Sequence, residues 1–109
     1  MSLDANQIYE SVSKAGEEWA DKKAAYELLD DMTSTVRADV TTDFYGSCSS
    51  KAEAQERALA SKIYKDHLAS LSAARRAWLL AEVKYKSVQL LAELRRSEES
   101  SRRAEMNLR

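Results

Sequence analysis

The sequence contains no proline and only two glycines, so the residues that most often interrupt helices are almost absent. The one cysteine excludes an intrachain disulfide and is compatible with a reducing compartment. β-Branched residues never alternate over the length of a strand, which argues against a sheet. No apolar run approaches the roughly 20 residues of a membrane span, and the start lacks the features of a signal peptide. We therefore expect a cytoplasmic protein without a membrane segment.

What the sequence does contain is typical of helices. Alanine, leucine, glutamate, lysine and arginine, which are strong helix formers, make up much of its 109 residues. A chain of this length has room for one domain with a thin core. The composition predicts an all-α fold and a single helical domain over residues 1–109.

The first half carries apolar and small side chains at alternating spacings of four and three residues. This spacing is typical of one face of a long helix that pairs with another. It predicts a helix over about residues 5–43, opened by a capping box between Asp4 and Gln7. The residues expected along its core or oligomer seam are Ile8, Val12, Trp19, Tyr26, Leu29 and Val36.

A cluster of small and turn-prone residues at 44–50 predicts the reversal of the chain. Here Gly46 is expected to take the left-handed conformation that closes many helices. Ser50 and Glu53 form the S-x-x-E pattern, in which each side chain caps the backbone N–H of the other residue. The next helix should therefore begin near residue 51.

The second half repeats the four-and-three spacing and predicts a helix over about residues 51–107. Its weakest point is Ser70–Ser72, where a kink would convert the long antiparallel helical hairpin into three helices. The seam residues expected on this helix are Tyr64, Leu71, Trp78, Tyr85 and Val88.

The second helix is longer than the first, which leaves its end without a partner in its own chain. A two-helix hairpin with wide apolar stripes cannot cover its own core. We therefore expect a homo-oligomer, preferably a dimer, that forms a coiled-coil-like helical bundle. The tail that would contact another subunit or partner includes Leu91, Leu94, Arg95, Arg96, Arg102, Arg103 and Met106.

The charge is divided unevenly between the halves although the net charge is −1. Residues 1–61 hold 6 basic and 12 acidic side chains, and residues 62–109 hold 11 basic and 6 acidic ones. One interpretation is that an acidic helix packs against a basic one. The alternative is a nucleic-acid interface, with aromatic residues among the cations. Its contacts would include Arg75, Arg76, Lys84 and Lys86.

Residues that could carry chemistry are sparse. Cys48 and the single histidine, His67, are about 19 residues apart, near 28 Å along a helix, so they should not meet as a catalytic pair. The sequence has no zinc-binding spacing and no glycine-rich phosphate loop. We expect a protein that is not an enzyme and that binds no metal and no other cofactor.

Several segments resemble a group of small all-α proteins of unknown function from tailed bacteriophages and prophages. The resemblance is carried by Trp19-Ala20-Asp21, Ala25–Leu29, Ala58–Leu68, Leu94–Ser97 and Arg103–Met106. It implies an accessory role in the cytoplasm of the bacterial host, and it carries over no active residue. The leading hypothesis is a non-enzymatic phage accessory protein that binds a phage or host protein through an oligomeric helical bundle.

Two other functions stay open. The first is a DNA-binding accessory of phage recombination or replication, which would use the basic second half. The second is a secreted helical hairpin, because the predicted fold is similar to that of the WXG100 family. Phe44-Tyr45-Gly46 stands where that family has W-x-G, so the tryptophan is missing here.

Overall fold

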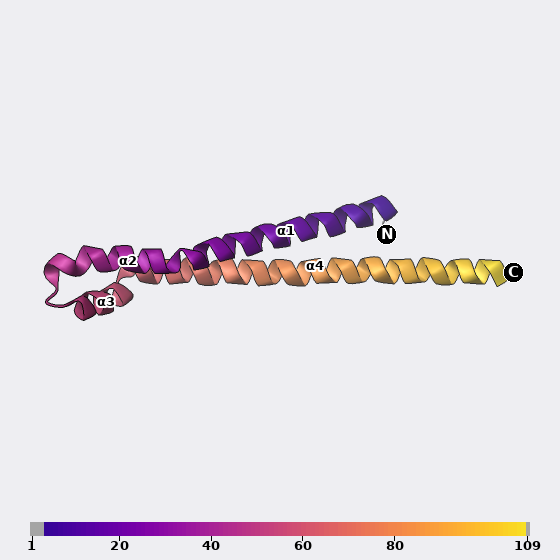
Figure 1. Cartoon of the computed structure of the whole chain (residues 1–109). Coiled ribbons are helices and arrows are strands. Elements are labelled where there is room, and N and C mark those ends of the chain that lie inside the picture. Colours follow the sequence, from indigo (N-terminus) through magenta and orange to yellow (C-terminus); the bar gives the residue numbers. More distant parts are fainter. Residues whose placement is uncertain (1–3, 109) are drawn as a thin grey trace. The chain divides into compact units, whose positions relative to one another are not determined.

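The computed structural model describes residues 4–108, and within them it contains helices and no strand (Figure 1). The prediction of an all-α helical hairpin is confirmed. The elements are helix α1 (Ala5–Asp31), helix α2 (Thr33–Phe44), the 3₁₀ turn η1 (Tyr45–Ser47), helix α3 (Lys51–Ala60) and helix α4 (Lys62–Leu108).

The chain is organised as two compact units, each of which combines segments from both halves of the sequence. Unit 1 contains residues up to Asp21 and those from Leu79 onward, and unit 2 contains Lys22–Trp78. Helices α1 and α4 contribute residues to both units. The expectation of a single domain stays a prediction.

Helix α1 begins as the sequence predicts, because Asp4 and Gln7 cap each other. The Gln7 N–H donates to Asp4 Oδ1 at 2.8 Å, and the Asp4 N–H donates to Gln7 Oε1 at 3.0 Å. The predicted helix over 5–43 is interrupted only at Met32, where α1 ends and α2 follows. The backbone hydrogen bond from Met32 N–H to the Leu28 carbonyl is kept at 3.1 Å, so the interruption is slight.

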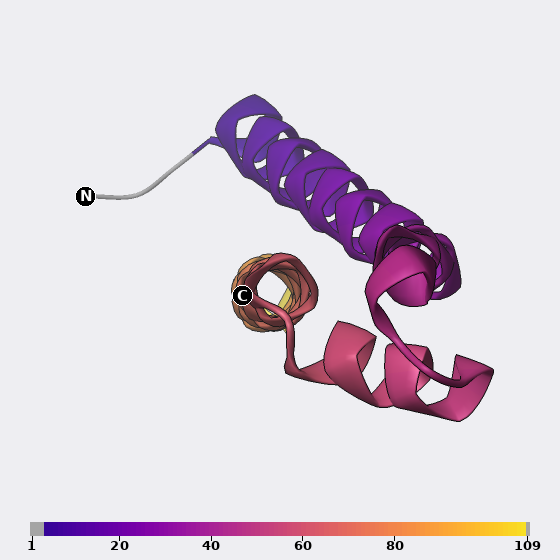
Figure 2. The same cartoon turned by 90° about the vertical axis from the view of Figure 1, so that its left-hand side faces the viewer.

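The turn differs from the prediction at Gly46. No glycine among the described residues has a positive φ, so Gly46 does not close the helix in the left-handed conformation. Instead α2 tightens into η1, and the backbone becomes extended at Cys48. Helix α3 then packs beside α2 (Figure 2). Tightening into a 3₁₀ turn is a common alternative end for an α-helix, and it needs no left-handed residue.

The break in the second half lies at Ser61, and the suggested kink at Ser70–Ser72 is wrong. Helix α4 passes through Ser70–Ser72 without interruption, whereas Ser61 has an extended backbone between α3 and α4. The Ser61 hydroxyl donates to the Ala58 carbonyl at 2.7 Å and accepts from the Tyr64 N–H at 3.2 Å. One side chain therefore caps the end of α3 and the start of α4.

The buried side chains are few and small. In unit 2, Val40 and Thr41 of α2 are buried, as are Ala54 and Ala58 of α3. The Thr41 hydroxyl donates to the Arg37 carbonyl at 2.7 Å, so its burial leaves no unpaired donor. In unit 1, Ala15 and Ala81 are buried. Alanine at these positions lets helices approach closely, and the large apolar side chains are left half-buried or exposed.

None of the helices within residues 4–108 combines the length and the apolar character that crossing a membrane would require.

Candidate interaction surfaces

The predicted seam residues lie along the partly covered faces of the helices. All eleven are half-buried: Ile8, Val12, Trp19, Tyr26, Leu29, Val36, Tyr64, Leu71, Trp78, Tyr85 and Val88. Other residues on the same four-and-three spacing are also half-buried or buried. They include Ala15, His67, Ala74, Ala81 and Ala92. Neither half of the hairpin covers this seam completely.

In unit 1, helices α1 and α4 meet at a stacked aromatic pair. The rings of Trp19 and Tyr85 have centroids 5.8 Å apart and an interplanar angle of 29°. Gly16 lies against the Tyr85 ring, since a Cβ at this position would be 3.1 Å from the ring carbons. An ion pair between Glu18 Oε2 and Lys84 Nζ at 3.3 Å lies in the same unit.

In unit 2, a second aromatic pair joins the same two helices. The Tyr26 and Trp78 rings stack with centroids 5.3 Å apart and an interplanar angle of 22°. The Thr33 hydroxyl and His67 Nε2 lie 2.9 Å apart within hydrogen-bond reach. The hydrogen bond ties α2 to α4, and it gives the single histidine a structural partner.

The sequence contains a signal for these two pairs that the spacing analysis missed. Each helix carries a tryptophan followed seven residues later by a tyrosine, namely Trp19 with Tyr26 and Trp78 with Tyr85. When two such helices run antiparallel, each tryptophan faces the tyrosine of the other helix. Stacked aromatic pairs contribute about 0.5–1.5 kcal/mol beyond their buried area, so each pair favours this antiparallel pairing within its own unit.

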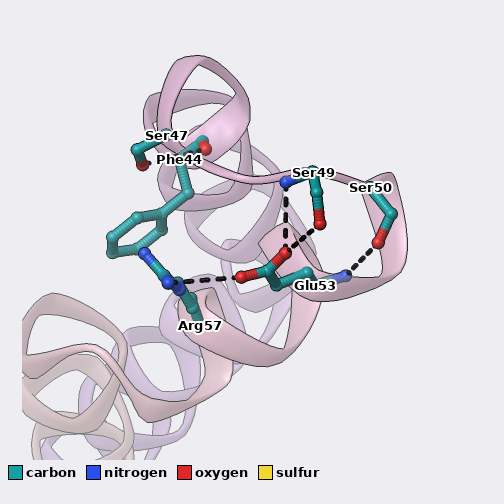
Figure 3. Close-up of polar contacts among 6 residues, drawn as sticks. All are labelled: Phe44, Ser47, Ser49, Ser50, Glu53 and Arg57. Atoms are coloured by element: carbon teal, nitrogen blue, oxygen red, sulfur yellow. Dashed lines mark hydrogen bonds and ion pairs between the residues drawn. The ribbon is translucent and has the colours of Figure 1, made fainter.

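Glu53 organises the turn in unit 2 (Figure 3). Its N–H donates to Ser50 Oγ at 3.1 Å, which is the predicted N-cap. Its carboxylate does not reach the Ser50 N–H, however, and instead accepts from the Ser49 hydroxyl at 2.6 Å and the Ser49 N–H at 3.1 Å. These two bonds, with a further contribution from Arg57, lower the pKa of Glu53. Glu53 also pairs with Arg57 at 3.2 Å.

The predicted partner-binding tail remains helical to Leu108, and most of it is open to solvent. Leu91 and Leu94 are 66% and 53% exposed, and Met106 is 69% exposed. Arg95 is half-buried and pairs with Glu99 at 3.5 Å. The remaining predicted tail residues, Arg96, Arg102 and Arg103, are exposed.

The predicted nucleic-acid contacts fall into two groups. Lys84 and Lys86 are engaged with carboxylates within unit 1, since Lys84 pairs with Glu18 and Lys86 pairs with Glu82 at 3.2 Å. Arg75 and Arg76 are exposed. A phosphate would have to compete with a carboxylate for each of the two lysines.

A cleft of about 400 Å³ opens within unit 1 between the start of α1 and residues 89–99 of α4. Ile8, Val12 and Ala92 give it an apolar lining, and Arg96 and Glu99 contribute charge.

Side chains suited to metal binding do not gather in the part of the chain that the structure describes. Residues 4–108 contain no cluster of three or more His, Cys, Asp or Glu side chains placed to hold a metal ion. Cys48 is a free, half-buried thiol beside the turn. The expectation that the protein is not an enzyme stays a prediction.

Comparisons with protein-family models, with curated proteins and with solved structures returned no match for this chain.

Proposed function

We propose that this protein is a non-enzymatic interaction protein, an oligomeric helical bundle that binds a phage or host protein through the tail of α4. The observation that carries this proposal is the presence of two pairs of large apolar side chains that are left uncovered toward the end of that helix, at 91 and 94 and at 106 and 108. Leu91, Leu94, Met106 and Leu108 are all more than half exposed, and Leu108 reaches 88%. Uncovered apolar side chains that gather on one element mark protein-binding surfaces.

The tail is also suited to partner recognition because it is already helical in the isolated chain. A preformed helix loses less conformational entropy on binding than a disordered segment does. Its apolar side chains are interspersed with Arg102, Arg103 and Glu105, which would supply the polar rim of an interface. The phage setting rests on the sequence resemblance and is part of the same proposal.

Affinity capture from bacterial cells, with and without phage infection, tests this proposal. Met106→Glu should reduce the recovery of a captured protein about ten-fold or more, because it places a charge in an apolar contact. Asn107→Glu is the matched control, since it adds the same charge to the neighbouring exposed position. Equal recovery with both variants would refute the assignment of the tail.

A DNA titration separates this proposal from the nucleic-acid alternative. Fluorescence anisotropy of labelled single- and double-stranded DNA should show no sub-micromolar binding at low or at physiological salt. Tight binding that weakens steeply with salt would instead favour the DNA-binding function, because neutralised phosphates release counterions.

A further inference from the structure

We propose that a second copy of this chain binds antiparallel along the outer face of α4, with the two helices crossing at Ser87. This inference deepens the proposed function, on which it rests, by naming the occupant of one surface. Leu91 and Leu94 contact the second copy, and Met106 and Leu108 stay exposed for the captured partner. The surface is a second apolar stripe formed by Leu80, Val83, Ser87, Leu91 and Leu94.

The second stripe is separate from the face of α4 that packs within unit 1. At about 100° per residue, the stripe is centred roughly 130° around the helix from Ala81, Tyr85, Val88 and Ala92. Its four large side chains are exposed, from 53% at Leu94 to 66% at Leu91. A solvated helix face normally carries polar side chains here, so a face of leucine and valine indicates that something covers it.

The apolar side chains of the second stripe have the same spacing from both ends, and this symmetry points to a second copy as the occupant. Leu80 and Leu94 are each seven residues from Ser87, and Val83 and Leu91 are each four residues from it. In a two-fold symmetric contact, residue i of one copy meets residue j of the other, and j meets i. An antiparallel pair centred on Ser87 therefore places leucine opposite leucine and valine opposite leucine on both sides of the axis. A different protein would not require such a palindrome.

Charge at the two ends selects the antiparallel direction. Arg76 and Glu98 are each eleven residues from Ser87, on the same face of α4 and exposed. Antiparallel pairing puts the arginine of one copy opposite the glutamate of the other at both ends of the contact. Parallel pairing would place arginine against arginine and glutamate against glutamate, which is unfavourable. Lys84 and Lys86, which border the stripe, already pair with Glu18 and Glu82.

Ser87 is suited to the centre of the contact. Its side chain is small, so two helices can approach closely where they cross. Its hydroxyl donates to the Val83 carbonyl of its own helix at 2.9 Å. Burial between two helices would therefore leave no unpaired hydroxyl donor.

Disulfide trapping in the full-length chain tests the geometry. With Cys48→Ser as background, Ser87→Cys should form an intermolecular disulfide readily under mild oxidation, because the two copies of this residue meet at the axis. Ser101→Cys is the matched control, since its two copies would lie on the order of 40 Å apart in the antiparallel pair. Cross-linking at 101 that equals or exceeds cross-linking at 87 would overturn the antiparallel arrangement.

Sedimentation of variants with reversed charges tests the pairing of Arg76 with Glu98 of the second copy. The wild-type chain should sediment as a dimer at micromolar concentration, and Arg76→Glu or Glu98→Arg should each weaken the dimer about ten-fold, because each opposes like charges at both ends. The double variant should restore wild-type affinity. A wild-type monomer, or a double variant that dimerises as weakly as the single variants, would overturn the inference.

The two proposals can fail separately. A monomer that still captures a partner in a Met106-dependent manner would leave the tail-binding proposal standing. A dimer that captures nothing would refute the tail-binding proposal alone.

Discussion

Two regions of this protein, the turn region (residues 40–61) and the C-terminal tail (residues 91–108), are both helical but are stabilised in different ways. The turn region buries Val40, Thr41, Ala54 and Ala58 and uses serine side chains to cap its helices. The tail leaves its leucines and Met106 exposed. The comparison shows that the tail is helical without buried side chains, whereas small buried side chains and caps accompany the places where helices pack within the chain.

The largest effect should come from enlarging a buried alanine in the turn region. Ala58 is 0% exposed, so Ala58→Leu overpacks its surroundings and should lower the free energy of unfolding by about 1–3 kcal/mol. Ala104→Leu makes the same change in the exposed tail and should stay within about 0.5 kcal/mol of wild type. Urea unfolding followed by circular dichroism measures both. Equal effects would show that the two regions do not differ in packing.

Removing a helix cap should have the next largest effect. Ser50→Ala deletes the acceptor of the Glu53 N–H and should destabilise the protein by about 1 kcal/mol. Ser100→Ala in the tail removes a serine from a helix interior and should instead stabilise by a few tenths of a kcal/mol, because alanine has the higher helix propensity. Thermal melts of the two variants should shift in opposite directions. A shift in the same direction would argue against a capping role of Ser50.

Acidification should weaken the turn region through Glu53. Its pKa is lowered in the folded protein by the two hydrogen bonds from Ser49, so the ionised carboxylate is the form that stabilises the fold. This contribution is fully present above the ordinary glutamate pKa and is lost as the pH falls through the lowered one. The difference in denaturant midpoint between wild type and Glu53→Gln should therefore shrink on acidification. A difference that stays constant with pH would contradict this role of the carboxylate.

The smallest effect concerns the two glycines. Gly46 has no positive φ, and an added Cβ would meet nothing within 4 Å, so Gly46→Ala should stabilise the protein by about 0.4–1 kcal/mol through the unfolded state. Gly16→Ala adds a methyl group 3.1 Å from the Tyr85 ring, which must shift. We expect Gly16→Ala to stabilise less than Gly46→Ala, or to destabilise. Calorimetry measures the melting temperatures of both variants. A larger increase in melting temperature for Gly16→Ala than for Gly46→Ala would refute the close contact with Tyr85.

Sequence reasoning found the helices because their signals are local. The capping box of Asp4 and Gln7 and the cap at Ser50 depend on residues three positions apart, and both are present in the structure. It failed at Ser61 and Gly46, where the outcome depends on how α3 packs beside α2. A single serine gives a weak local signal, so the sequence pointed to Ser70–Ser72 and did not predict the break at Ser61. The exposure of the tail was predictable, because the second segment is longer than the first and its end has no partner in its own chain.

The sequence by itself determined the all-α character and the hairpin of two long amphipathic segments, since 3.6-residue periodicity and capping are properties of neighbouring residues. Only the tertiary structure decided which apolar faces are used within the chain. It stacks Trp19 on Tyr85 and Tyr26 on Trp78, and it leaves the second stripe of α4 uncovered. Both faces of α4 carry apolar side chains at spacings of three and four residues. Which face becomes buried therefore depends on the residues from distant parts of the chain that pack against it.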